Sequence, residues 1–126
     1  MRWINDLIVS TVVLCILDAG FINMNLRLFE EQVASIQRVV MQVRPEGAIA
    51  CYLFLVLGLN YFIIRQKKSI LDAFLFGLVI YGVYECTGYT IFKKWNPYLV
   101  VIDTLWGGVL MALTTMIVYS THKRII

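Results

Sequence analysis

Four apolar runs dominate the chain and restrict its fold more than any other feature of the sequence. They cover residues 5–23, 47–64, 70–92 and 98–120. An α-helix rises about 1.5 Å per residue, so about 20 apolar residues cross the hydrocarbon core of a bilayer. Transmembrane strands are shorter and alternate strictly between apolar and polar residues, which these runs do not. We therefore predict an all-α fold, an integral membrane four-helix bundle, with residues 1–126 forming a single membrane domain.

Composition agrees with a multi-pass membrane protein. Hydrophobic residues make up 60% of the chain, whereas soluble domains contain about 45–50% apolar residues. A soluble chain this apolar would expose large hydrophobic patches and aggregate. We therefore expect membrane lipid to be the main partner of the surface.

The segment between the first two runs, residues 25–44, has a different pattern. Its apolar residues recur at steps of three and four, as on one face of a helix: Leu26, Phe29, Val33, Ile36, Val40 and Val43. Pro45 and Gly47 then end the pattern. We predict an amphipathic helix that lies in the membrane interface or folds back over the bundle. A homo-oligomer or a protein partner would bind through this helix.

Basic residues lie mostly between the apolar runs rather than in a basic stripe with interleaved aromatics, so we expect no nucleic-acid partner. Six Lys and Arg residues fall on the side of the chain ends and the 65–69 loop, against five on the other side. Positive residues favour the cytoplasmic side of a membrane. We therefore predict that both termini are cytoplasmic.

Three acidic residues, Asp18, Glu85 and Asp103, lie inside the apolar runs. A charge at mid-bilayer costs about 2.5–3.5 kcal/mol on insertion scales. Short connections make neighbouring spans antiparallel, which brings the three acids to depths of about 7–11 Å below the same membrane surface. Tyr52 falls at the same depth on the second span. We call the three acids the acidic layer, and we expect at least one of them to be protonated at neutral pH.

We predict that the acidic layer belongs to a buried acidic and aromatic pocket. The candidate ligand-binding residues share helix faces at steps of three and four, with Trp106 as an apolar wall: Asp18, Tyr52, Tyr81, Glu85, Asp103 and Trp106. Arg44 and Lys94 are candidate counter-charges at the near ends of their spans. A structural reading stays open, because polar residues in membrane proteins often only bond helices together.

Metal and redox chemistry have little support in the sequence. No Glu-x-x-His pair is present, the only histidine is His122, and the cysteines form no C-x-x-C motif. We interpret Cys15, Cys51 and Cys86 as buried packing thiols. We therefore predict no metal site and no cofactor.

Several of these residues resemble a family of small four-span membrane proteins of unknown function, the DUF2177 family. The resemblance covers nearly the whole chain and is carried by LDAGFIN (17–23), YECT (84–87), DTLWG (103–107) and Arg44-Pro45. Two positions depart from the family pattern, because Phe21 replaces a common tryptophan and Glu85 replaces the usual aspartate. The resemblance implies a four-span fold, important acids and a link with lipid modification, but no established activity.

Our first hypothesis is a non-enzymatic multi-span membrane protein whose acidic pocket binds lipid or a small polar ligand. The second is a membrane enzyme or an accessory subunit of lipid modification that uses Glu85 or Asp103 as an acid–base group. The third is a structural component of a larger assembly, and the fourth is a small proton-coupled transporter. The sequence favours a protein that is not an enzyme but does not decide between these classes.

Overall fold

The computed structural model describes residues 2–37, 45–91 and 96–125, and all but a few of them are helical. The elements are α1 (Arg2–Met24), α2 (Leu26–Gln37), α3 (Pro45–Leu59), the π-helix η1 (Asn60–Ile64), α4 (Ile70–Ile91) and α5 (Pro97–Ile125). The described residues contain no strand, so the predicted all-α class is confirmed.

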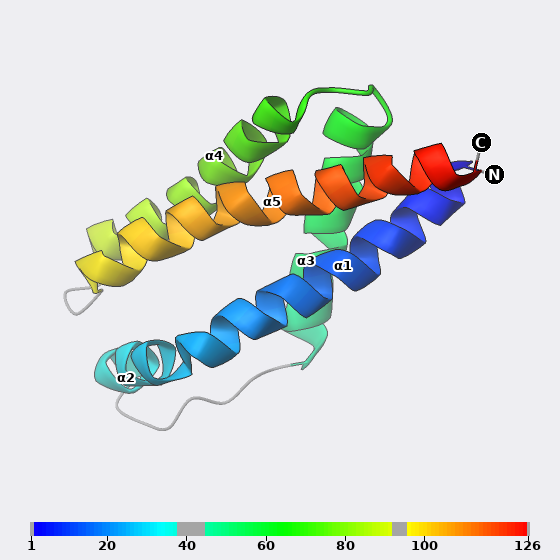
Figure 1. Cartoon of the computed structure of the whole chain (residues 1–126). Helices are drawn as coiled ribbons and strands as arrows, with labels where there is room; N and C mark the ends of the chain where they lie inside the picture. The colour runs from blue at the N-terminus through cyan, green and yellow to red at the C-terminus, as the bar shows by residue number, and fades with distance from the viewer. Residues whose placement is uncertain (1, 38–44, 92–95, 126) are drawn as a thin grey trace.

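Within the described residues, four helical segments are long and apolar enough to cross a membrane: Trp3–Met24, Pro45–Ile64, Ile70–Ile91 and Pro97–Thr121. The predicted integral membrane four-helix fold is confirmed by these segments. Figure 1 shows that α1 begins and α5 ends at the same end of the bundle. We call this the terminal end, and the end that holds α2 the α2 end.

Helices α4 and α5 form the most extensive contact of the fold, and α5 also packs on α1, which in turn contacts α3. Gly77 of α4 and Gly107 of α5 make the α4–α5 contact close. A Cβ atom at Gly77 would overlap the carbonyl oxygen of Gly107, and one at Gly107 would overlap the ring of Tyr81. Small residues allow this approach of helix backbones, as they commonly do in membrane interfaces.

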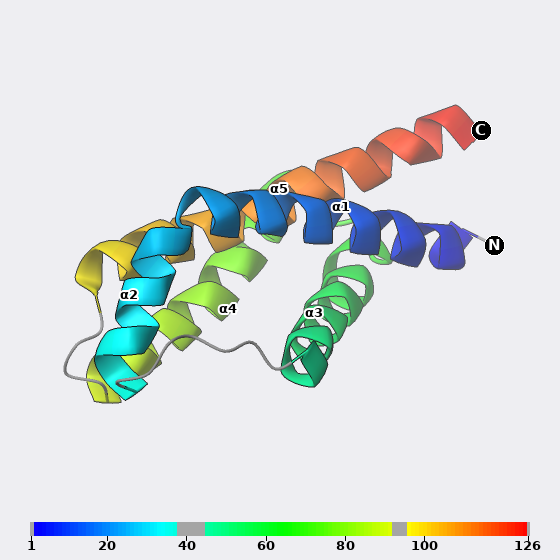
Figure 2. The same cartoon turned by 90° about the horizontal axis from the view of Figure 1, so that it is seen from below.

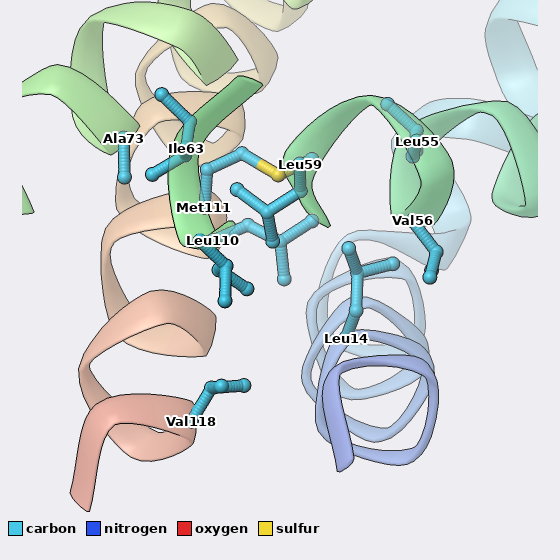
Figure 3. Packing of buried hydrophobic residues seen from close by; sticks show 10 residues of the cluster. Leu14, Leu55, Val56, Leu59, Ile63, Ala73, Leu110, Met111 and Val118 are labelled. Atoms are coloured by element: carbon cyan, nitrogen blue, oxygen red, sulfur yellow. The ribbon is translucent and has the colours of Figure 1, made fainter. Parts of the chain in front are cut away.

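Leucine side chains from three helices fill the centre of the bundle. Leu14 of α1, Leu59 of α3 and Leu110 of α5 are fully buried. Figure 3 shows Leu14 directed toward the side chains of α3 and α5. Lipid tails are as apolar as leucine, so these side chains join the helices through van der Waals packing rather than through removal from water.

The first half of α3 packs much less tightly than its second half. Ile49 and Phe54 are 67% and 74% exposed, whereas Leu59 is fully buried. In Figure 2 this part of α3 stands apart from α4. The interpretation of all three cysteines as buried is wrong, since Cys51 and Cys86 are exposed and Cys15 is only partly buried. The physical reason is that α3 and α4 each contribute only one narrow face to a thin bundle.

Helix α2 turns away from α1 after Asn25 and crosses the end of the bundle (Figure 2). The side chain of Gln32 is buried, and its Oε1 accepts a hydrogen bond at 2.7 Å from the backbone N–H of Asn96 at the start of α5. The helix therefore docks on the bundle through a polar contact. The rest of the predicted amphipathic range, residues 38–44, lies outside the described residues, and its place in the interface stays a prediction.

Candidate functional site

Asp18 joins three membrane-spanning helices through its carboxyl group. Its Oδ1 accepts a hydrogen bond from Nε1 of Trp106 on α5 at 2.9 Å, and its Oδ2 accepts one from the hydroxyl of Tyr52 on α3 at 2.5 Å. Only 7% of Asp18 is exposed. A hydrogen bond between membrane helices contributes on average about 0.6 kcal/mol. Asp18 therefore fixes α1, α3 and α5 at one level.

Trp106 has both an apolar and a polar role. Its ring stacks on Phe21, with the centroids 4.7 Å apart and the planes at 2°, and Phe21 meets Phe29 of α2 edge to face at 6.2 Å. The sequence predicted only the apolar wall and missed the hydrogen bond to Asp18. The missed signal is chemical, because a buried indole N–H usually finds an acceptor.

Glu85 of α4 and Asp103 of α5 form a second polar contact at this level. They are 1% and 8% exposed, and their side chains lie close enough to interact electrostatically. Two ionised carboxylates this close would repel each other, and the expectation that one of the acids is protonated stays a prediction. The pair therefore differs chemically from Asp18, which receives its hydrogen bonds from neutral donors.

Tyr81 links the two parts of the layer. It lies one helical turn before Glu85, its ring packs against Gly107, and it is within electrostatic range of both Asp18 and Asp103. The structure thus brings all six candidate ligand-binding residues into one region of the α2 end. Their binding role stays a prediction.

The candidate counter-charges Arg44 and Lys94 lie outside the described residues. Within the described ranges, no group of three or more His, Cys, Asp and Glu side chains is arranged to hold a metal ion. The acidic layer thus has two parts. Asp18 accepts hydrogen bonds from Tyr52 and Trp106, and Glu85 and Asp103 form a separate pair beside it.

A second polar group at the terminal end was not predicted. Ser10 is fully buried; its Oγ donates at 2.6 Å to the carbonyl oxygen of Asp6 and accepts at 2.9 Å from Nδ2 of Asn60. Asp6 itself is only 6% exposed. The sequence signal was weak, because Asp6 and Asn60 lie toward the ends of apolar runs, where polar side chains are common, and a serine inside a span is not unusual.

The sequence profile of a family described as "Predicted membrane protein (DUF2177)" matches residues 3–120, which is nearly the whole chain. This match confirms the resemblance seen in the span motifs. Neither a curated protein nor a solved structure matches the chain.

Proposed function

The chain belongs to the DUF2177 family of predicted membrane proteins, and we propose that it is a non-enzymatic protein that binds a lipid or small polar ligand at its acidic layer. The observation that carries this proposal is the burial of three carboxyl groups, from α1, α4 and α5, in one region inside the spans. Such residues in membrane spans mark functional sites by default.

The energetic balance supports binding over simple helix adhesion. Each intramembrane charge costs about 2.5–3.5 kcal/mol, whereas a hydrogen bond between membrane helices contributes on average about 0.6 kcal/mol. Serine, threonine or asparagine side chains would join helices at a lower cost. The insertion cost of three acids therefore exceeds the stabilisation that their interhelical hydrogen bonds alone would contribute.

Carboxyl oxygens are acceptors, so the ligand should supply a hydrogen-bond donor, such as an amine or a hydroxyl group. Asp18 already receives two donors from the protein. We assign the ligand contact to Glu85 and Asp103, because a donor from the ligand would bond the two acids and reduce the repulsion between them. Asp18 then serves to position the helices around them.

A ligand that enters the acidic layer from the lipid would move past the side chain of Tyr52. It is partly buried and lies on the loosely packed half of α3, between exposed residues such as Cys51 and Leu53. A small outward movement of this half of α3 would open the layer toward the lipid without disturbing the α4–α5 contact.

A purely structural role is the second candidate, and the hydrogen bonds of Asp18 to α3 and α5 favour it. The two functions differ in what Glu85 does. In the structural role, loss of Glu85 changes stability only, whereas in the binding role it also removes a ligand.

The test is native mass spectrometry of the protein in mild detergent, with the lipids of the expression membrane as the probe. We expect wild-type protein to carry a bound molecule that Glu85→Gln and Asp103→Asn both lose. Asp72→Asn is the matched control, because Asp72 is exposed at the start of α4. Identical bound molecules in all four proteins would contradict the binding role.

A further inference from the structure

A cavity of about 670 Å³ lies at the terminal end, between the start of α1 and the end of the second span. Asp6 lines it and lies twelve residues before Asp18 on α1, which corresponds to about 18 Å along the helix. The cavity is therefore separate from the acidic layer. Its volume is within the range of about 300–1,000 Å³ that is usual for small-molecule sites.

The π-helix η1 shapes one wall of this cavity. The backbone N–H of Arg65 bonds the carbonyl oxygen of Asn60 at 2.8 Å, five residues earlier, which is the π-helical spacing. Nδ2 of Asn60 is directed to α1, where it bonds Ser10. Single π-turns inside longer helices are frequent at functional sites. This one places Asn60, Tyr61 and Ile64 along the cavity.

The cavity has an apolar side and a charged rim. Leu7, Leu57 and Ile64 supply aliphatic walls, and Trp3 and Tyr61, which are 60% and 58% exposed, lie on its aromatic side. Trp and Tyr are typical of the headgroup level of a bilayer. The rim carries the cations of Arg65 and Lys67, which lie just beyond the end of the span at Ile64.

The turn that carries these cations is fixed in place. Lys67 has a φ of 54°, a left-handed conformation, and its N–H bonds the carbonyl oxygen of Ile64 at 3.0 Å. The N–H of Lys68 bonds Ile63 at 2.9 Å, which completes a Schellman cap. The hydroxyl of Tyr119 donates to the carbonyl oxygen of Lys68 at 2.7 Å, so α5 holds the turn.

We propose that this cavity binds a phospholipid whose headgroup carries a primary ammonium, as phosphatidylethanolamine does. Arg65 and Lys67 face the phosphate, because guanidinium and ammonium groups donate strong hydrogen bonds to phosphate oxygens. Asp6 accepts from the headgroup ammonium. The acyl chains leave along Leu7, Leu57 and Ile64. The charge pattern of the cavity, two cations and one acid, thus complements a zwitterionic headgroup.

The experiment places the protein in bilayer nanodiscs that contain equal amounts of phosphatidylethanolamine, phosphatidylcholine and phosphatidylglycerol with identical chains. After gentle extraction, native mass spectrometry identifies the retained lipid. We expect phosphatidylethanolamine to be enriched. Choline has no N–H to donate to Asp6, and phosphatidylglycerol has no ammonium.

Variants separate the two halves of the headgroup site. Lys67→Gly removes a cation and suits the positive φ, and we expect it to lower total phospholipid retention several-fold. Asp6→Asn should lower the ratio of retained phosphatidylethanolamine to retained phosphatidylglycerol by about tenfold. This change corresponds to the loss of one charge-assisted hydrogen bond. Lys68→Gln is the control, because Lys68 belongs to the same turn but does not line the cavity.

Retention of the three lipids in the proportions of the mixture by wild-type protein would overturn the proposal. So would enrichment of phosphatidylglycerol, or an equal effect of Lys68→Gln and Lys67→Gly, because either result would indicate attraction to a basic loop only. Glu85→Gln should leave the enrichment unchanged. This result keeps the test independent of the ligand proposed for the acidic layer.

Discussion

The indole nitrogen of Trp106 donates a hydrogen bond to the carboxyl group of Asp18 at 2.9 Å, although the two residues are 88 positions apart in the chain. This bond connects the first and last spans within the acidic layer. Trp106 also stacks on Phe21, one turn after Asp18. A polar contact is thus shielded by an aromatic one, and the same level of the bundle holds the Glu85–Asp103 pair.

Tyr52→Phe should destabilise the protein by about 0.6–1.7 kcal/mol, because it removes one hydrogen bond to Asp18 inside the membrane. Reversible unfolding in bicelles measures this difference. Tyr98→Phe is the control, since Tyr98 is 61% exposed, and it should have little effect. Equal effects of the two substitutions would show that the Tyr52 hydroxyl does not bond Asp18.

The Glu85–Asp103 contact predicts one protonated carboxyl group at neutral pH. Infrared spectroscopy of the protein in bilayers should show the carbonyl stretch of that group at pH 7. Glu85→Gln and Asp103→Asn should each shift or weaken this band, because each substitution removes one of the two carboxyl groups in the contact. Asp72→Asn should leave the band unchanged. A wild-type spectrum with only ionised carboxylates at pH 7 would contradict this prediction.

Gly77→Ala should destabilise the bundle by about 1–3 kcal/mol, the usual cost of overpacking. The added methyl group would collide with the backbone of Gly107, which a rotamer change cannot avoid. Gly20→Ala is the matched control, because nothing lies within 4 Å of a Cβ at that position. Thermal unfolding in detergent compares the two. A Gly77→Ala protein as stable as Gly20→Ala would contradict the close α4–α5 packing.

Gln32→Ala should loosen α2 from the bundle. The side chain of Gln32 bonds the backbone of Asn96, and such a bond contributes about 0.5–1.5 kcal/mol. Hydrogen exchange over Leu26–Gln37 should accelerate by up to about tenfold. Glu31→Gln is the control: it removes only the exposed ion pair with Arg27, which contributes little. Unchanged exchange in Gln32→Ala would mean that α2 is held elsewhere.

The number of spans and the common depth of the acids could be predicted from the sequence, because both depend only on run length, helical rise and short connections. The choice of hydrogen-bond partners could not. Hydropathy does not specify how each span is rotated about its axis, so it did not indicate that Trp106 donates to Asp18. The same limit explains the exposed Cys51 and Cys86.

The terminal end was harder to predict than the acidic layer. Asn60 lies in a continuous apolar run, and nothing in that run indicates a π-helix. The turn at Lys67 contains no glycine to mark its positive φ. Both features are accompanied by contacts with other helices, through Ser10 and Tyr119, which become visible only when the spans are packed.

The most direct test of the central claim, that Asp18 joins separate spans within a buried acidic layer, is a double-mutant cycle between Asp18→Ala and Trp106→Phe. The free energy of unfolding in bicelles should show a coupling of about 0.6–1.7 kcal/mol between the two substitutions. The control cycle, Asp72→Asn with Trp106→Phe, should be additive. Additive effects of Asp18→Ala and Trp106→Phe would contradict the account.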